Sequence, residues 1–132
     1  MRVLSIALMV AAASLLSGCV TPSTKPLAST PISLTDEQIE KIQTFIRLRL
    51  KDPNSAIFST IVASRLEENG AIVACGFVNA KNSFGGYTGR KPFLAGIKMP
   101  EGQLAVRMTD ELTNAELILN HCRISGVTPV LE

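Results

Sequence analysis

Hydrophobic and polar positions divide the chain into three parts. An uncharged apolar run covers residues 4–16, and a stretch rich in proline, serine and threonine covers residues 20–33. Patterns typical of helices and strands fill the rest. The apolar run follows Arg2 and ends in small residues, as secretory signal peptides do, and it is too short to span a bilayer permanently. We therefore expect a signal peptide at 1–18, an extended tether at 19–33 and one domain at 34–132.

A helix is predicted at each end of the domain. The first begins with a capping box at Thr35–Gln38 and should end before Asp52-Pro53. Its apolar stripe consists of Ile39, Ile42, Phe45, Ile46 and Leu50. The second helix is expected over about Asp110–Arg123, with Asp110 or Thr109 as its cap. Both patterns are amphipathic, so each helix should bury one face against the rest of the domain.

Four strands are predicted between the helices. Residues 56–66 and 71–78 are rich in β-branched side chains and flank an Asn-Gly turn, which is a strong hairpin signal. Residues 91–98 and 103–108 form a second predicted pair, and Gly96 inside it should weaken the strand or mark a bulge. The expected fold class is α+β, a small antiparallel sheet of about four strands with an N-terminal and a C-terminal helix packed on one side.

Cys19 directly follows the small pair Ser17-Gly18. This arrangement resembles the lipobox of bacterial lipoproteins, in which the cysteine is diacylated and becomes the first residue of the mature chain. The resemblance implies a lipid anchor on Cys19, with fatty acyl groups such as palmitate. Val20 does not match the aspartate of the inner-membrane retention signal, which favours the outer membrane facing the periplasm. An ordinary secretory signal with a chance cysteine is the alternative.

The chain has three cysteines, an odd number that would leave one thiol unpaired in an exported protein. Acylation of Cys19 would leave Cys75 and Cys122 as one possible pair. The space outside the inner membrane is oxidising, so a disulfide there can persist. We expect this disulfide, with two separately buried thiols as the alternative.

Charge and reactive side chains exclude several functions. The formal net charge is only +2, which argues against a nucleic-acid-binding protein. The one histidine, His121, adjoins Cys122, but consecutive helix residues diverge around the axis, so the two do not form a nucleophile pair. One histidine and two oxidised cysteines cannot supply a zinc set. We therefore expect no catalytic residues, no metal and no cofactor.

Residues 75–93 carry a second resemblance. They match the pattern CGxVNxKNxxGGYxGxxPF at every lettered position, and the segment LKDPNSA precedes them at 50–56. This block resembles the signature of a widespread group of small exported proteobacterial proteins, many of them lipoproteins. The resemblance implies a family and a compartment, and it supplies no catalytic residues.

The same block contains the candidate binding residues Lys81, Tyr87, Arg90 and Lys91. No acidic residue lies between Glu68 and Glu101, so a basic loop with one aromatic side chain could dock an anionic partner. An envelope protein, peptidoglycan and lipopolysaccharide all qualify. The alternative is a turn that bonds only to itself, with its aromatic side chains packed on the sheet.

These observations predict a non-enzymatic lipoprotein of the bacterial cell envelope, held to the membrane by Cys19 and acting as a binding or accessory module. Two other functions remain open. The basic loop could inhibit a cell-wall hydrolase of the lysozyme type by entering its acidic cleft. Alternatively, the protein could have a purely structural role in the envelope. A weak hydrolase is disfavoured because no base and nucleophile come together.

Overall fold

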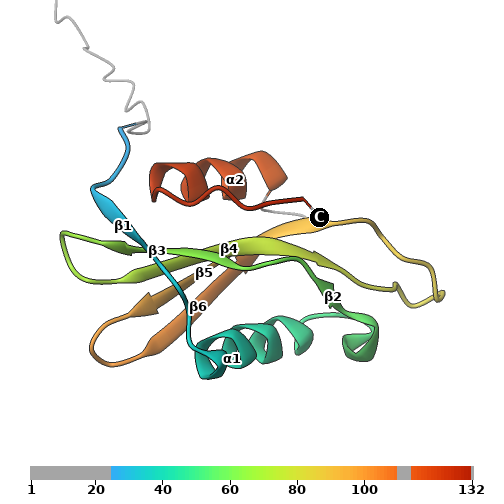
Figure 1. Ribbon diagram of the computed structural model, residues 1–132. Coiled ribbons are helices and arrows are strands. Elements are labelled where there is room, and N and C mark those ends of the chain that lie inside the picture. Colours follow the sequence, from blue (N-terminus) through green and yellow to red (C-terminus); the bar gives the residue numbers. More distant parts are fainter. Residues whose placement is uncertain (1–24, 110–113, 132) are drawn as a thin grey trace, which may run out of the picture.

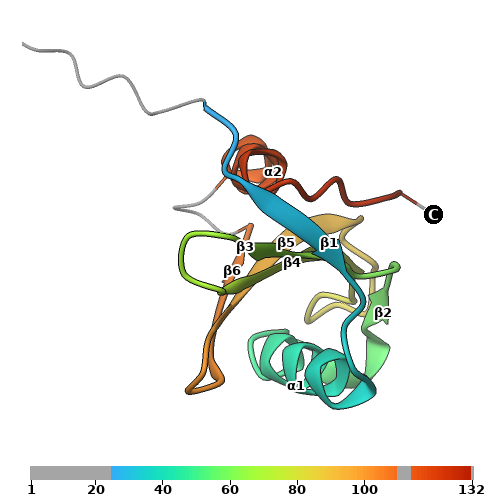
Figure 2. The same cartoon turned by 60° about the vertical axis from the view of Figure 1, so that its left-hand side comes forward.

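A computed structural model describes residues 25–109 and 114–131. The signal peptide at 1–18, the lipidation site Cys19 and the predicted cap Asp110 lie outside these residues. Within them, one sheet lies between two helices, α1 (Asp36–Arg47) and α2 (Ala115–Ile124), which cover opposite faces (Figures 1 and 2). The α+β class is therefore confirmed, whereas the expectation of both helices on one side is wrong.

In the part of the chain that the structure describes, the sheet has six strands rather than about four, and every pair is antiparallel. The strands are β1 (Ser29–Ile32), β2 (Ile57–Phe58), β3 (Val62–Leu66), β4 (Ile72–Asn79), β5 (Lys91–Lys98) and β6 (Gln103–Met108). They are ordered β1-β3-β4-β5-β6, and β2 pairs with the far end of β4. The predicted strand 56–66 divides into β2 and β3, both on β4. Gly96 keeps the regular register of β5, so no bulge occurs there.

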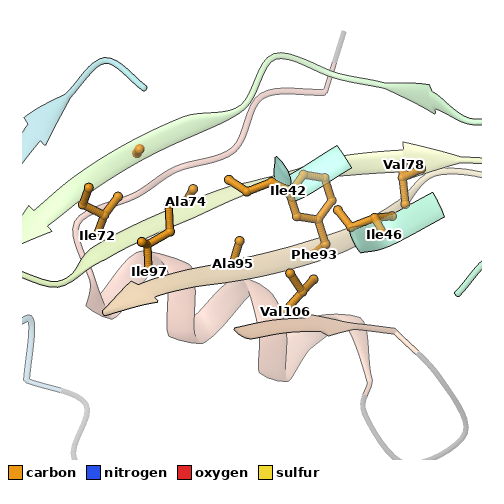
Figure 3. Packing of buried hydrophobic residues seen from close by; sticks show 10 residues of the cluster. Ile42, Ile46, Ile72, Ala74, Val78, Phe93, Ala95, Ile97 and Val106 are labelled. Atoms are coloured by element: carbon orange, nitrogen blue, oxygen red, sulfur yellow. The ribbon is translucent and has the colours of Figure 1, made fainter. Parts of the chain in front are cut away.

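The central strand β4 is buried on both faces, because side chains alternate between the two sides of a strand. Ile72, Ala74 and Val78 face α1, where Phe93 and the α1 residues Ile42 and Ile46 complete the larger cluster (Figure 3). Val73 and Cys75 face α2 and contact Ile118 and Cys122. A strand that is buried on both faces has apolar residues at consecutive positions and therefore lacks the alternation of apolar and polar residues. The sequence of β4 lacks this alternation.

The helix boundaries differ from the predicted ones. The capping box of α1 is present, since Gln38 N donates to Thr35 Oγ1 at 3.2 Å and Thr35 N donates to Gln38 Oε1 at 2.9 Å. However, α1 ends at Arg47, well before Asp52-Pro53. Helix α2 is capped by Asn114, whose side chain accepts from Leu117 N at 2.7 Å. Thr109 is not the cap, because its hydroxyl donates to the carbonyl of Pro92.

The predicted tether is wrong over its last residues. Ser29–Ile32 form β1, which pairs with β3, and Pro31 is tolerated because β1 is an edge strand. Leu27 N also donates to Ile124 O at 2.7 Å at the end of α2. The N-terminal segment is therefore part of the domain from Leu27 onward.

Candidate binding surface

The disulfide prediction is confirmed. Cys75 on β4 and Cys122 on α2 are joined with a Cα–Cα distance of 6.2 Å, and both are fully buried. The neighbouring His121 turns back along its own helix, with Nδ1 2.8 Å from the carbonyl oxygen of Leu117. Within the described residues, no group of three or more His, Cys, Asp or Glu side chains could hold a metal ion. The cysteines thus fasten a helix to the sheet.

Residues 80–90, here named the β4–β5 loop, are organised by Asn82. Its Oδ1 accepts from Phe84 N at 2.9 Å and from Gly86 N at 3.1 Å, and its backbone N–H donates to Gly86 O at 2.8 Å. Gly85 adopts a positive φ of 83° within this turn, which favours glycine. The predicted turn that bonds to itself is therefore present.

The loop is held to the rest of the domain through Lys81 and is closed on itself at its base. Lys81 N donates to Ser55 Oγ at 2.8 Å, and that hydroxyl donates in turn to the carbonyl of Asp52. Thr88 N donates to Ala80 O at 3.1 Å across the base of the loop. The loop is thus fastened through Lys81 and braced by its own hydrogen bonds, so its exposed side chains are presented on a fixed backbone.

Gly76 and Phe93, at the two ends of the sequence block, have a role in the core. They are cross-strand partners, and a Cβ at position 76 would lie 2.9 Å from Phe93 Cζ. Glycine therefore leaves the space that the fully buried Phe93 ring fills. Phe93 therefore packs on the sheet, as predicted for a block whose role is only structural.

Tyr87 does not pack on the sheet. It is 49% exposed, and its ring is contacted by Lys81, with Nζ 5.5 Å from the ring centroid. Lys81 and Tyr87 also face each other across an isolated β-bridge. Phe84, at the turn, is 97% exposed. The loop therefore presents two aromatic rings and one ammonium group to solvent, although burial would stabilise the rings.

Arg90 and Lys91 lie at the base of the loop and are exposed. Arg90 makes no hydrogen bond or ion pair within the described part of the chain. It lines a pocket of about 160 Å³ on the sheet. The pocket's other lining residues are Ile57, Phe58, Ser59, Phe77 and Asn79. Lys91 pairs with Val78, which faces α1, so strand alternation places Lys91 on the opposite face from the pocket residues Phe77 and Asn79.

The four candidate residues thus fall into three positions. Lys81 and Tyr87 come together on the loop, Arg90 joins the pocket, and Lys91 stands apart. Sequence reasoning missed Phe84, Ile57 and Asn79. Nothing in the local sequence shows that Phe84 is exposed, and the placement of Ile57 beside Asn79 depends on the pairing of β2 with β4.

Comparison of the chain with protein-family models, curated proteins and solved structures finds no match. Among residues 25–109 and 114–131, neither helix has the length and apolar character needed to cross a membrane.

Proposed function

We propose that this protein is a non-enzymatic lipoprotein of the bacterial cell envelope, anchored through Cys19 and facing the periplasm from the outer membrane. The apolar leader and the Ser-Gly-Cys sequence support the anchor. The Cys75–Cys122 disulfide also supports it, because the pairing leaves Cys19 as the one cysteine available for acylation. A buried disulfide is in addition typical of an oxidising compartment.

The domain acts as a binding module through its loop surface, defined as Lys81, Phe84, Tyr87 and Arg90. The observation that carries this proposal is the exposure of Phe84 and Tyr87 on a backbone fixed by Asn82 and Ser55. Aromatic and arginine side chains are enriched among the residues that dominate binding energy, and aromatic rings on a fixed backbone lose little side-chain entropy on binding. The basic groups favour an anionic partner.

Pull-down from envelope extracts with the mature chain tests the surface. The double substitution Tyr87→Ala/Arg90→Ala should abolish partner capture and leave thermal stability nearly unchanged, because neither side chain is in the core. Lys98→Ala, an equally exposed basic residue at the other end of β5, is the matched control and should retain capture. A cooperative loss of fold in the double variant would instead favour a purely structural role for the loop.

Metabolic labelling with a palmitate analogue tests the anchor. The chain should incorporate the label and fractionate with membranes, and Cys19→Ser should abolish incorporation. An unlabelled, unprocessed chain in the cytosol, with all three thiols open to alkylation, would contradict the proposal.

A second candidate function is inhibition of a lysozyme-type hydrolase. It is favoured by the fixed turn that carries Phe84 at its exposed end and Lys81 nearby, a shape and charge suited to an acidic cleft. A lysis assay with the purified chain discriminates: protection of cells at micromolar concentration, lost in Phe84→Ala, would support inhibition. No protection at that concentration would eliminate it.

A further inference from the structure

The pocket beside the loop surface combines one cationic group with an apolar floor. Phe77 lies at its base and is only 6% exposed, whereas Ile57 at the rim is 58% exposed. Among the described residues that line the pocket, Arg90 is the one charged residue and none carries a carboxylate. Its guanidinium, free of partners within the described residues, is available to an anion. A planar guanidinium matches the two oxygens of a carboxylate.

The position of the pocket follows from the sheet. Phe77 and Asn79 lie on the face that α2 covers, but the cluster beneath α2 ends at Cys75 on β4. The short strand β2 pairs Ile57 with Asn79 at the same end. The pocket thus occupies sheet surface that the helix leaves open.

Asn79 supplies a second polar group. Its Oδ1 is buried and has no hydrogen-bond partner among residues 25–109 and 114–131, an arrangement that is rare in folded proteins and costs about 1–3 kcal/mol. The oxygen lies below the pocket surface, so pairing requires the carboxamide to turn toward a ligand. An unpaired acceptor beside Arg90 would be satisfied by an N–H group close to a carboxylate. Phosphate and acetate offer no such N–H group.

The size of the pocket limits the ligand. Sites for drug-sized molecules measure about 300–1,000 Å³, so a pocket of about 160 Å³ would hold a single small residue. An N-acylated amino acid with a free carboxylate and a small side chain fits all three features. Its carboxylate would pair with Arg90, its amide N–H with Asn79, and its side chain would lie on Phe77.

We propose that this pocket binds the carboxyl terminus of a peptide that ends in a small residue such as alanine. This inference deepens the proposed function, on which it rests, by naming the chemistry that the loop end of the domain recognises. The same chemistry has two sources, the D-alanine termini of cell-wall peptides and the L-residue termini of proteins.

NMR titration of the chain from residue 20 onward, exported so that the disulfide forms, tests the proposal. That chain contains every helix and strand that the structure describes. The probes are N-acetyl-D-alanine and N-acetyl-L-alanine, with N-acetylalaninamide, acetate and inorganic phosphate as controls. Saturable shifts of the Phe77, Asn79 and Arg90 amides with either enantiomer support the proposal, and the tighter enantiomer identifies the source.

Variants sharpen the test. Arg90→Gln should weaken binding at least tenfold, as should removal of the carboxylate in N-acetylalaninamide, whereas Lys98→Gln should bind as the natural chain does. Asn79→Val should weaken binding without loss of thermal stability, because it removes an unpaired buried oxygen. No saturable shift at tens of millimolar probe would overturn the proposal. Equal affinity for phosphate or acetate, or equal weakening by Arg90→Gln and Lys98→Gln, would also overturn it.

Failure of this proposal is distinguishable from failure of the proposed function. Lys81→Ala/Tyr87→Ala should lose envelope capture and keep its affinity for N-acetylalanine, because neither residue lines the pocket. A chain that captures its partner through Tyr87 but binds no N-acetylalanine would retain the proposed function and refute the pocket ligand.

Discussion

Gly76 and Gly96 show how differently two glycines in one sheet can act. Both lie inside strands and neither has a positive φ. A Cβ at position 76 would approach Phe93 Cζ to 2.9 Å, whereas a Cβ at position 96 would meet no atom within 4 Å. Phe93 is fully buried and packs edge-on against Phe58, so its ring has little freedom to yield. Gly76 is thus required by packing, and Gly96 is not.

We expect Gly76→Ala to lower the free energy of unfolding by about 1–3 kcal/mol, the usual cost of overpacking a core. Gly96→Ala is the matched control and should leave stability unchanged or raise it by up to about 1 kcal/mol, because alanine restricts the unfolded chain. Urea unfolding followed by circular dichroism measures both. Equal effects of the two substitutions would show that backbone propensity, and not the contact with Phe93, explains the need for glycine at position 76.

At the level of elements, β1 closes the edge of β3. Four residues pair in register, from Ser29 with Leu66 to Ile32 with Ala63. The end of α2 is fastened to the same corner, where the Ser64 hydroxyl donates to the carbonyl of Ser125. Gly126 there has a φ of 74° and lies so close to Ser29 that a Cβ would clash with its hydroxyl. The N-terminal strand and the end of α2 therefore depend on each other.

Truncation tests the contribution of β1. A chain that begins at residue 25 should keep full stability, whereas one that begins at residue 34 should lose at least about 2 kcal/mol, taking about 1 kcal/mol for each net hydrogen bond. The shorter chain exposes an unpaired edge of β3, so it should also self-associate. Urea unfolding and sedimentation measure the two effects. Equal stability of both chains would mean that residues 29–32 contribute no more than the predicted tether.

The Cys75–Cys122 disulfide links β4 to α2, two elements that are far apart in the sequence. Replacing both cysteines, Cys75→Ala/Cys122→Ala, should lower the free energy of unfolding by roughly 3–4 kcal/mol, because 46 intervening residues are no longer closed into a loop in the unfolded chain. Dithiothreitol should destabilise the natural chain by a similar amount and leave the double variant unchanged. A natural chain insensitive to the reductant would contradict the assignment of stability to this bond.

Sequence reasoning succeeded where a signal was local. The bounds of β5 and β6, the Asn-Gly hairpin and the Thr35 cap were all predicted, since each depends on neighbouring residues. It failed where contacts with a distant segment of the chain determine the local structure. Ser29–Ile32 becomes a strand because β3 offers an open edge, and the helices take opposite faces because β4 is apolar on both. The disulfide could be predicted from the cysteine count, whereas the pocket could not, because it depends on β2 meeting Asn79.

For the whole molecule, the two ends of β4 separate the N-terminal strand β1 from the loop surface. Ser29 pairs with Leu66 beside the turn that precedes β4, and Glu67 N donates to Ala28 O there. The β4–β5 loop follows Asn79, eight residues further along β4, which corresponds to about 25 Å. From Cys19 to Ala28 the chain can span at most about 30 Å. If Cys19 is acylated as proposed, the anchor attaches to the end of the domain that carries the β3–β4 turn, whereas the loop surface lies at the opposite end (Figure 1).

A photoreactive benzoylphenylalanine at two positions tests this orientation in living cells. Glu68, exposed in the β3–β4 turn, and Phe84, exposed on the β4–β5 loop, both tolerate a large side chain because neither packs in the core. Position 68 should form lipid adducts, whereas position 84 should form none and should instead cross-link to a component of the aqueous space beyond the membrane. Lipid adducts at position 84 would mean that the domain lies flat on the bilayer. The loop surface would then face lipid headgroups, and a partner in the periplasm could not reach Tyr87 without displacing them.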